Sequence, residues 1–81
     1  MSLPQPQLGD LADFIGALAL GAMGKMQIPG ETIPVDRPRA RWFIDLLAVV
    51  NSNLAEEVDP AQRQRIEAVL NQLRMAFIEG E

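Results

Sequence analysis

The sequence predicts an all-α fold: a three-helix antiparallel arrangement, completed by homo-oligomerisation into a larger helical bundle. Apolar residues recur at steps of three and four in separate segments, which is the spacing of a helix face. Prolines and polar residues divide these segments near residues 8–26, 37–55 and 60–79. Short connections favour antiparallel neighbours. We expect a single helical domain over residues 8–81, preceded by a disordered tail at residues 1–7.

Chain length is the reason to expect association. A domain of 81 residues buries only about 60% of its unfolded surface and is marginally stable alone. The sequence has no cysteine and no histidine, so it lacks disulfides and the usual zinc ligands. Sharing a core between protomers is the remaining route to stability. The expected partner is therefore a second copy, in a homodimer or a higher oligomer.

Composition argues against several functional classes. The net charge of −4 disfavours nucleic-acid binding, which needs a basic face, and it favours a soluble cytoplasmic protein. Without Cys, His or Tyr, the chain lacks the usual nucleophile–base pairs, so we expect no enzyme and no cofactor. Glu56, Glu57 and Asp59 could bind a divalent cation, but their spacing matches no EF-hand loop, so we expect solvated side chains and no metal.

The first helix is predicted to carry its apolar face on residues spaced by three and four: Leu8, Leu11, Ile15, Leu18 and Ala22. Asp10 is placed to accept backbone hydrogen bonds at its start. Gly16, Gly21 and Gly24, among several alanines, predict a close contact with another helix. The alternative is a weak helix that frays near Gly24. The uncharged stretch 14–24 is shorter than the roughly 20 residues that a membrane span requires.

Residues 27–35 are expected to form a connection, because Pro29, Gly30 and Pro34 are turn signals. Ile28, Ile33 and Val35 are expected to hold it against the bundle. A short strand is the alternative, which Pro34 disfavours.

The second helix is expected to be buried on two sides. Asp36 is a suitable N-cap, and Pro38 lies in the first turn, where its missing N–H is not needed. The first apolar stripe, expected to face the core, contains Ala40, Phe43, Leu47, Val50 and Leu54. The second stripe, expected to face another subunit, contains Trp42, Leu46 and Val49, flanked by Ile44 and Ala48.

The third helix has the clearest start signal. Asp59, Pro60 and Gln62 predict an N-cap, a proline at the first helical position and a capping box. Its core face is expected to contain Ile66, Val69, Leu70, Leu73, Ala76 and Phe77. Met75 and Ile78 lie off this stripe and suggest a second contact, and Gly80 is expected to end the helix.

Two segments carry a resemblance to a known family. They read Ala40-x-x-x-Ile44-Asp45-Leu46-Leu47 and Leu70-x-x-Leu73-Arg74-Met75. With Asp36 and Pro60 at matching positions, the chain resembles DUF1844, a domain of unknown function found in short, helical, uncharacterised bacterial proteins. The family's Lys-Thr-x-Gly-Asn turn is replaced here by Asn53-Leu54-Ala55-Glu56-Glu57. The resemblance implies a helical fold and assigns no activity.

Together these patterns predict a small non-enzymatic homo-oligomeric protein that acts as an interaction or structural module, with another cytoplasmic protein as a further candidate partner. The predicted subunit interface contains Gly16, Leu20, Trp42, Leu46, Val49, Val50, Met75 and Ile78. Asp45 and Arg74 are predicted to form an ion pair, within or between subunits, against the alternative of two unrelated exposed charges.

Two other functions are less favoured by the sequence. One is a membrane-surface or small-ligand-binding protein that uses the Gly/Ala-rich first helix. The other is binding of a phosphate or nucleic acid through Arg37, Arg39 and Arg41, with Trp42 as a stacking aromatic. The alternative for these arginines is a solvated helix start.

Overall fold

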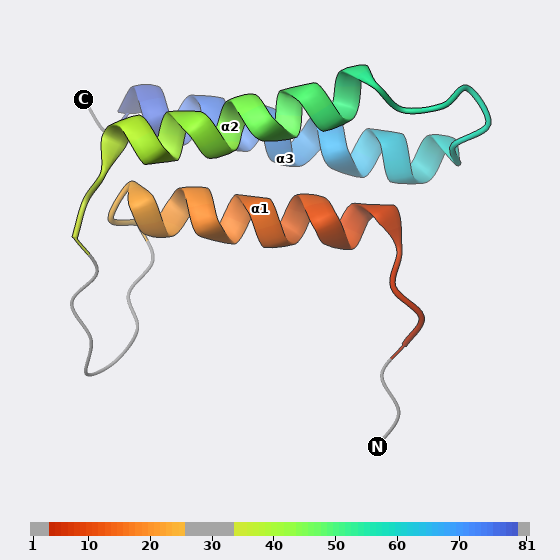
Figure 1. Ribbon diagram of the computed structural model, residues 1–81, viewed down its shortest axis with the longest axis horizontal. Helices are drawn as coiled ribbons and strands as arrows, with labels where there is room; N and C mark the ends of the chain where they lie inside the picture. Colours follow the sequence, from red (N-terminus) through yellow and green to blue (C-terminus); the bar gives the residue numbers. More distant parts are fainter. Residues whose placement is uncertain (1–3, 26–33, 80–81) are drawn as a thin grey trace.

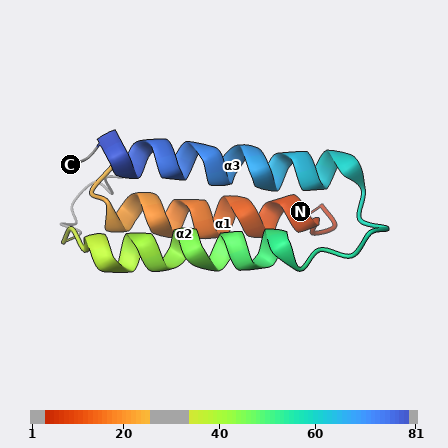
Figure 2. The same ribbon diagram turned by 90° about the horizontal axis from the view of Figure 1, so that it is seen from above.

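The computed structural model describes residues 4–25 and 34–79, which form three α-helices and contain no strand. They are α1 (Leu8–Ala22), α2 (Arg37–Ser52) and α3 (Pro60–Glu79). Consecutive helices run antiparallel, and each helix packs against the other two (Figures 1 and 2). The predicted all-α, three-helix architecture is confirmed for the single chain.

α1 ends at Ala22, earlier than the predicted boundary at residue 26, because a glycine turns the chain. Gly24 has a φ of 78°, which glycine adopts without steric cost. The N–H of Gly24 donates to the carbonyl of Gly21 at 3.1 Å, and that of Lys25 donates to the carbonyl of Leu20 at 2.9 Å. These two bonds form a Schellman motif, which satisfies the last carbonyls of the helix.

α2 begins as predicted and ends three residues earlier than predicted. Asp36 Oδ1 accepts a hydrogen bond from the backbone N–H of Arg39 at 3.1 Å, which confirms the N-cap. At the other end, Ser52 Oγ donates to the carbonyl of Ala48 at 2.9 Å. Asn53 Nδ2 donates to the carbonyl of Val49 at 2.8 Å. These side chains take the terminal carbonyls, so the helix ends at Ser52 and not at residue 55.

α3 has the predicted bounds of residues 60–79. Asp59 Oδ1 accepts from the N–H of Ala61 at 2.9 Å, so the predicted cap is present. The predicted capping box is wrong, because Gln62 turns toward α1 and accepts a hydrogen bond from the N–H of Gly9 at 2.8 Å. Gly80, the expected helix end, lies outside the described residues.

The side of α1 that is buried is not the predicted one. As a result, large apolar residues of α1 lie on the surface of the protein. The buried residues of α1 are mainly small, and they are Gly9, Ala12, Ile15, Gly16, Ala19, Gly21 and Ala22. Leu11 and Leu18, which were expected in the core, are 42% and 40% exposed. The prediction followed the largest apolar side chains, whereas the helix buries the side that allows the closest approach.

α2 and α3 supply the large side chains of the core. Leu47, Ile66 and Leu73 are the largest fully buried side chains. On α2, Ile44 is buried, while Phe43, predicted at the centre of the core stripe, is half-buried at its edge. On α3, the predicted face is confirmed: Ile66, Leu70 and Leu73 are buried and Val69, Ala76 and Phe77 pack against them. Large residues from two helices thus fill the space that the small residues of α1 leave.

The segments outside the helices bear on two further predictions. In the expected tail at residues 1–7, Gln7 donates its N–H to Asp10 Oδ2 at 2.8 Å, and residues 1–3 lie outside the described residues. In the connection at residues 27–35, Ile28 and Ile33 also lie outside them. Val35 is exposed, but its Cγ2 lies against Gly24 just after α1, so it contacts the bundle outside the core.

Two glycines of α1 give a matched test of this packing. A Cβ at Gly16 would lie 3.1 Å from Val69 Cγ1, whereas one at Gly21 would meet nothing within 4 Å. Gly21→Ala should therefore raise the free energy of unfolding by about 0.5–1 kcal/mol, the usual helix-propensity gain. Gly16→Ala should raise it by less, because the added methyl crowds Val69. Chemical denaturation measures both, and an equal gain for the two variants would contradict a tight α1–α3 contact.

Candidate functional site

The two flanks of α1 face different surroundings. Gly9, Asp13 and Gly16 form the flank toward α3, where they lie against Gln62, Arg65 and Val69 respectively. Leu11, Phe14 and Leu18, also at steps of three and four, therefore lie on the opposite flank, which borders α2. All three are exposed.

α2 extends the same apolar surface. Arg37 contacts Phe77 and so marks the flank of α2 that faces α3. Phe43, Leu46 and Val50 lie on the other flank, bordering α1, and are half-buried. Figure 1 looks onto this side of the bundle, with α3 behind α2. We call this surface the α1–α2 face; its members are Leu11, Phe14, Leu18, Phe43, Leu46 and Val50, with Trp42 and Val49 at its edge.

The α1–α2 face exposes large side chains. Phe14 is 64% exposed and Trp42 is 59% exposed. An aromatic side chain carries roughly 150–250 Å² of surface, so each leaves on the order of 100 Å² in solvent. The Trp42 and Phe43 rings meet edge to face, with centroids 5.5 Å apart and an interplanar angle of 78°. An exposed apolar patch of this kind is typical of a surface that binds a partner.

The other predicted interface residues lie in different places. Gly16 is buried and Leu20 is half-buried beside α3, so Gly16 makes the predicted close helix contact within the chain. Met75 and Ile78 are 63% and 68% exposed, on the side of α3 that faces away from the core. That a second subunit covers any of these residues stays a prediction.

A shallow groove runs between α1 and α3. It has a volume of about 240 Å³ and is lined by Asp13, Gly16, Ala17, Leu20, Val69, Gln72 and Leu73. Pockets for small ligands are usually enclosed and hold about 300–1,000 Å³. The groove is smaller than that, so it gives little support to the alternative of small-ligand binding through the first helix.

The Asp45–Arg74 pair is not formed within the chain. Both residues are exposed, and the ion pairs among the described residues are those of Arg39 with Asp36 and of Arg65 with Asp10 and Asp13. The intersubunit version of the Asp45–Arg74 pair stays a prediction.

The arginine-rich start of α2 has local roles that the sequence analysis missed. The Arg37 guanidinium lies 4.0 Å from the centroid of the Phe77 ring, and its Nη2 donates to the carbonyl of Phe77 at 2.7 Å. That carbonyl is in the last turn of α3, where carbonyls lack helical partners and a cation is favourable. Arg39 pairs with Asp36 at 3.6 Å. The contacts of Arg37 and Arg39 thus lie at helix ends, and no local sequence signal connects Arg37 to Phe77.

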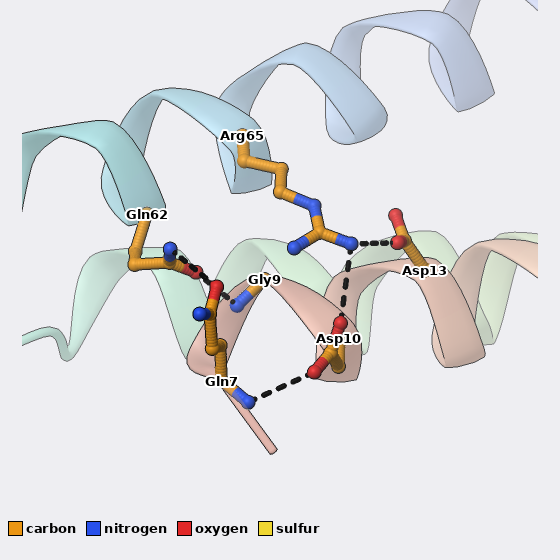
Figure 3. A network of polar contacts seen from close by, with 6 residues as sticks. All are labelled: Gln7, Gly9, Asp10, Asp13, Gln62 and Arg65. Carbon is orange, nitrogen blue, oxygen red and sulfur yellow. Dashed lines mark hydrogen bonds and ion pairs between the residues drawn. The ribbon is translucent and has the colours of Figure 1, made fainter. Parts of the chain in front are cut away.

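A network of polar contacts joins the start of α1 to α3 (Figure 3). Its members are Gln7, Gly9, Asp10, Asp13, Gln62 and Arg65. Gln62 accepts from Gly9 N–H and donates through Nε2 to Gln7 Oε1 at 3.0 Å. Because the first N–H groups of a helix lack helical partners, the Gly9 bond satisfies one of them from another helix.

Arg65 is the charged centre of the network. Its Nη2 donates to Asp13 Oδ2 and, at 3.2 Å, to Asp10 Oδ1. The Gln7 N–H and the Arg65 guanidinium lower the pKa of Asp10 below its ordinary value of 3.8. The hydrogen bond to Asp13 raises the pKa of Arg65. A guanidinium held between two carboxylates positions α1 on α3.

Two further observations concern metals and membranes. Across residues 4–25 and 34–79, no group of three or more His, Cys, Asp or Glu side chains is arranged to hold a metal ion. In the same ranges, none of the helices combines the length and the apolar character that crossing a bilayer requires.

Comparison with known proteins places the chain in a family. The family model described as Domain of unknown function (DUF1844) matches residues 5–79. The match spans all three helices and both segments that carry the resemblance. No curated protein and no solved structure matches the chain.

The Arg37–Phe77 contact predicts that substitutions of Arg37 and Arg41, one turn apart on α2, change the free energy of unfolding by different amounts. Arg37→Ala should lower the free energy of unfolding by about 1–2 kcal/mol, because it removes a cation–π contact and the cap of α3. Arg41→Ala should change it by less than about 0.5 kcal/mol, since Arg41 is exposed on the same helix. Thermal or chemical unfolding compares them. Equal effects of the two substitutions would show that the contact does not stabilise the fold.

The Asp10 contacts predict a pH dependence. A carboxyl whose pKa is lower in the folded chain stabilises the fold above the pKa of the unfolded chain. This contribution is lost as the pH falls through the folded pKa. Melting curves between about pH 6 and about pH 2 should show a smaller fall in melting temperature for Asp10→Asn than for the unchanged chain. Glu67→Gln, at an exposed position of α3, is the control, and an equal reduction there would refute the role of Asp10.

Proposed function

This chain belongs to the family Domain of unknown function (DUF1844), and from that premise we propose that it is a non-enzymatic, homo-oligomeric interaction module. The family description assigns no activity, so the proposal rests on the surface of the bundle. In it, two copies associate through their α1–α2 faces.

The observation that carries the proposal is the orientation of α1. This helix directs its glycines and alanines inward and leaves Leu11, Phe14 and Leu18 outside. Burying a leucine or phenylalanine side chain contributes about 1.5–3 kcal/mol. α1 exposes three such residues in one row, so their free energy of burial is gained only when a partner covers them.

The size of the face suits a dimer. From the exposed fractions of its residues, the face offers roughly 500 Å² of apolar surface in solvent. A standard interface buries about 800 Å² on each partner, of which somewhat more than half is apolar. The apolar area needed for a stable dimer is therefore about the area that the α1–α2 face provides.

A membrane surface is a less suitable occupant of the same face. Helices that lie in the membrane interface usually carry Lys and Arg on their polar side. The sequence of α1, LGDLADFIGALALGA, has neither, and its charged residues are Asp10 and Asp13. With a net charge of −4, the chain would also be repelled by anionic lipids.

The proposal includes a cytoplasmic location and leaves room for a second protein partner. The absence of cysteine fits a reducing compartment. Another cytoplasmic protein could bind the exposed side of α3, where Met75 and Ile78 lie. Catalysis is not part of the proposal, because the sequence has no Cys, His or Tyr to supply the usual catalytic pairs.

Sedimentation equilibrium tests the proposal. The unchanged chain should form dimers with a dissociation constant in the micromolar range or below. Phe14→Ser should raise that constant about tenfold or more, because it removes a large apolar side chain from the centre of the interface. Since Phe14 is mostly exposed in the single chain, the helical content measured by circular dichroism should stay the same.

The matched control is Met75→Ser. Met75 is exposed to the same degree as Phe14 but lies on α3, away from the α1–α2 face. Its dissociation constant should equal that of the unchanged chain. A monomer at all micromolar concentrations would refute self-association, and dimers that are weakened by Met75→Ser and not by Phe14→Ser would move the interface to α3.

A further inference from the structure

Most charged residues of the described bundle, other than Asp45 and Glu67, lie toward one of its two ends. One end is where α1 finishes and α2 starts, and the hydrogen bond from Asp36 N–H to the carbonyl of Ala22 at 2.8 Å holds these two points together. The other end holds the start of α1 and the turn between α2 and α3 (Figure 1).

The first end is basic. Among the described residues, five cations stand there against two carboxylates: Lys25, Arg37, Arg39, Arg41 and Arg74 against Asp36 and Glu79. The second end is acidic, with five carboxylates against two arginines: Asp10, Asp13, Glu56, Glu57 and Asp59 against Arg63 and Arg65. Glu56 and Glu57 are exposed in the turn, and Lys25 and Arg39 are exposed at the opposite end.

We infer that the occupant of the α1–α2 face is a second copy of this chain lying antiparallel to the first, so that the basic end of each copy meets the acidic end of the other. The inference rests on the proposed function and adds the partner's orientation. The twofold axis would lie in the plane of the interface and perpendicular to the helices, crossing near Phe14 of α1 and Leu46 of α2, which are close to the midpoints of their helices.

The charges decide between the two orientations that keep the faces together. With the copies parallel, the basic ends would meet each other and the acidic ends would do the same. Charges at the ends of the face are close enough to interact, since screening acts over about 8–10 Å at physiological salt. The antiparallel arrangement instead makes both ends complementary, which favours association and fixes its geometry. The centre of the face has no charged member, so it is compatible with either orientation.

Charge reversal tests the orientation through the dissociation constant of the full-length chain. Lys25→Glu with Arg39→Glu makes both ends acidic, and Glu56→Lys with Glu57→Lys makes both ends basic. Each pair of substitutions should weaken the dimer about tenfold, because like charges then meet at both ends. All four substitutions together reverse the sign of each end, keep the net charge, and should restore much of the affinity that either pair alone removes. Glu67→Lys, at an exposed position of the third helix that belongs to neither charged end, is the control that should have little effect.

The dependence on salt gives a second readout without substitutions. In the antiparallel dimer the dissociation constant should rise with salt, because screening weakens the attraction between unlike ends. If it falls with salt, or if the four substitutions together fail to restore the dimer, the antiparallel inference is overturned while the interaction module of the previous section stands. A chain that stays monomeric at every concentration would refute both.

Discussion

The structure depends on the close approach of α1 to the other two helices. A helix can come this close only where most side chains on its inner side are small, and Gly9, Ala12, Gly16 and Ala19 provide that side, with Ile15 as the one large buried residue of α1. Contact with Val69 sets the limit at Gly16, because even a methyl group there would lie 3.1 Å from Cγ1. Since the small residues must face inward, the large residues of α1 are left on the surface.

The rest of the bundle is arranged around this contact. Leu47, Ile66 and Leu73 from α2 and α3 fill the centre, while a polar contact at each end fixes the helices lengthwise. At one end Arg65 holds two carboxylates of α1, and at the other Arg37 holds the last turn of α3. The same arrangement creates the α1–α2 face and divides the charges between the ends, so the fold and the proposed association have one origin.

The sequence predicts the helices well and the sides they bury less well. Caps such as Asp36 and Asp59 act within their own segment, so local rules find them. The inner side of α1 was predicted wrongly, because amphipathic spacing favours burial of Leu11 and Leu18 over burial of the alanines. Only the packing of the three helices shows that the small residues face inward and let the helices approach closely. Partners distant in the chain, such as Arg37 with Phe77 or Gln62 with Gly9, have no local signal at all. Trp42 and Val49, predicted at a subunit interface, are exposed in the single chain, and that a second copy covers them stays a prediction.

The central claim is that a second copy covers the α1–α2 face, and the single tryptophan reports on it directly. Trp42 lies at the edge of this face and is mostly exposed in the single chain. Its fluorescence should shift to shorter wavelength, and become harder to quench with acrylamide, as the protein concentration rises through the dissociation constant. An emission maximum and a quenching constant that stay the same from dilute monomer to concentrated protein would contradict the account.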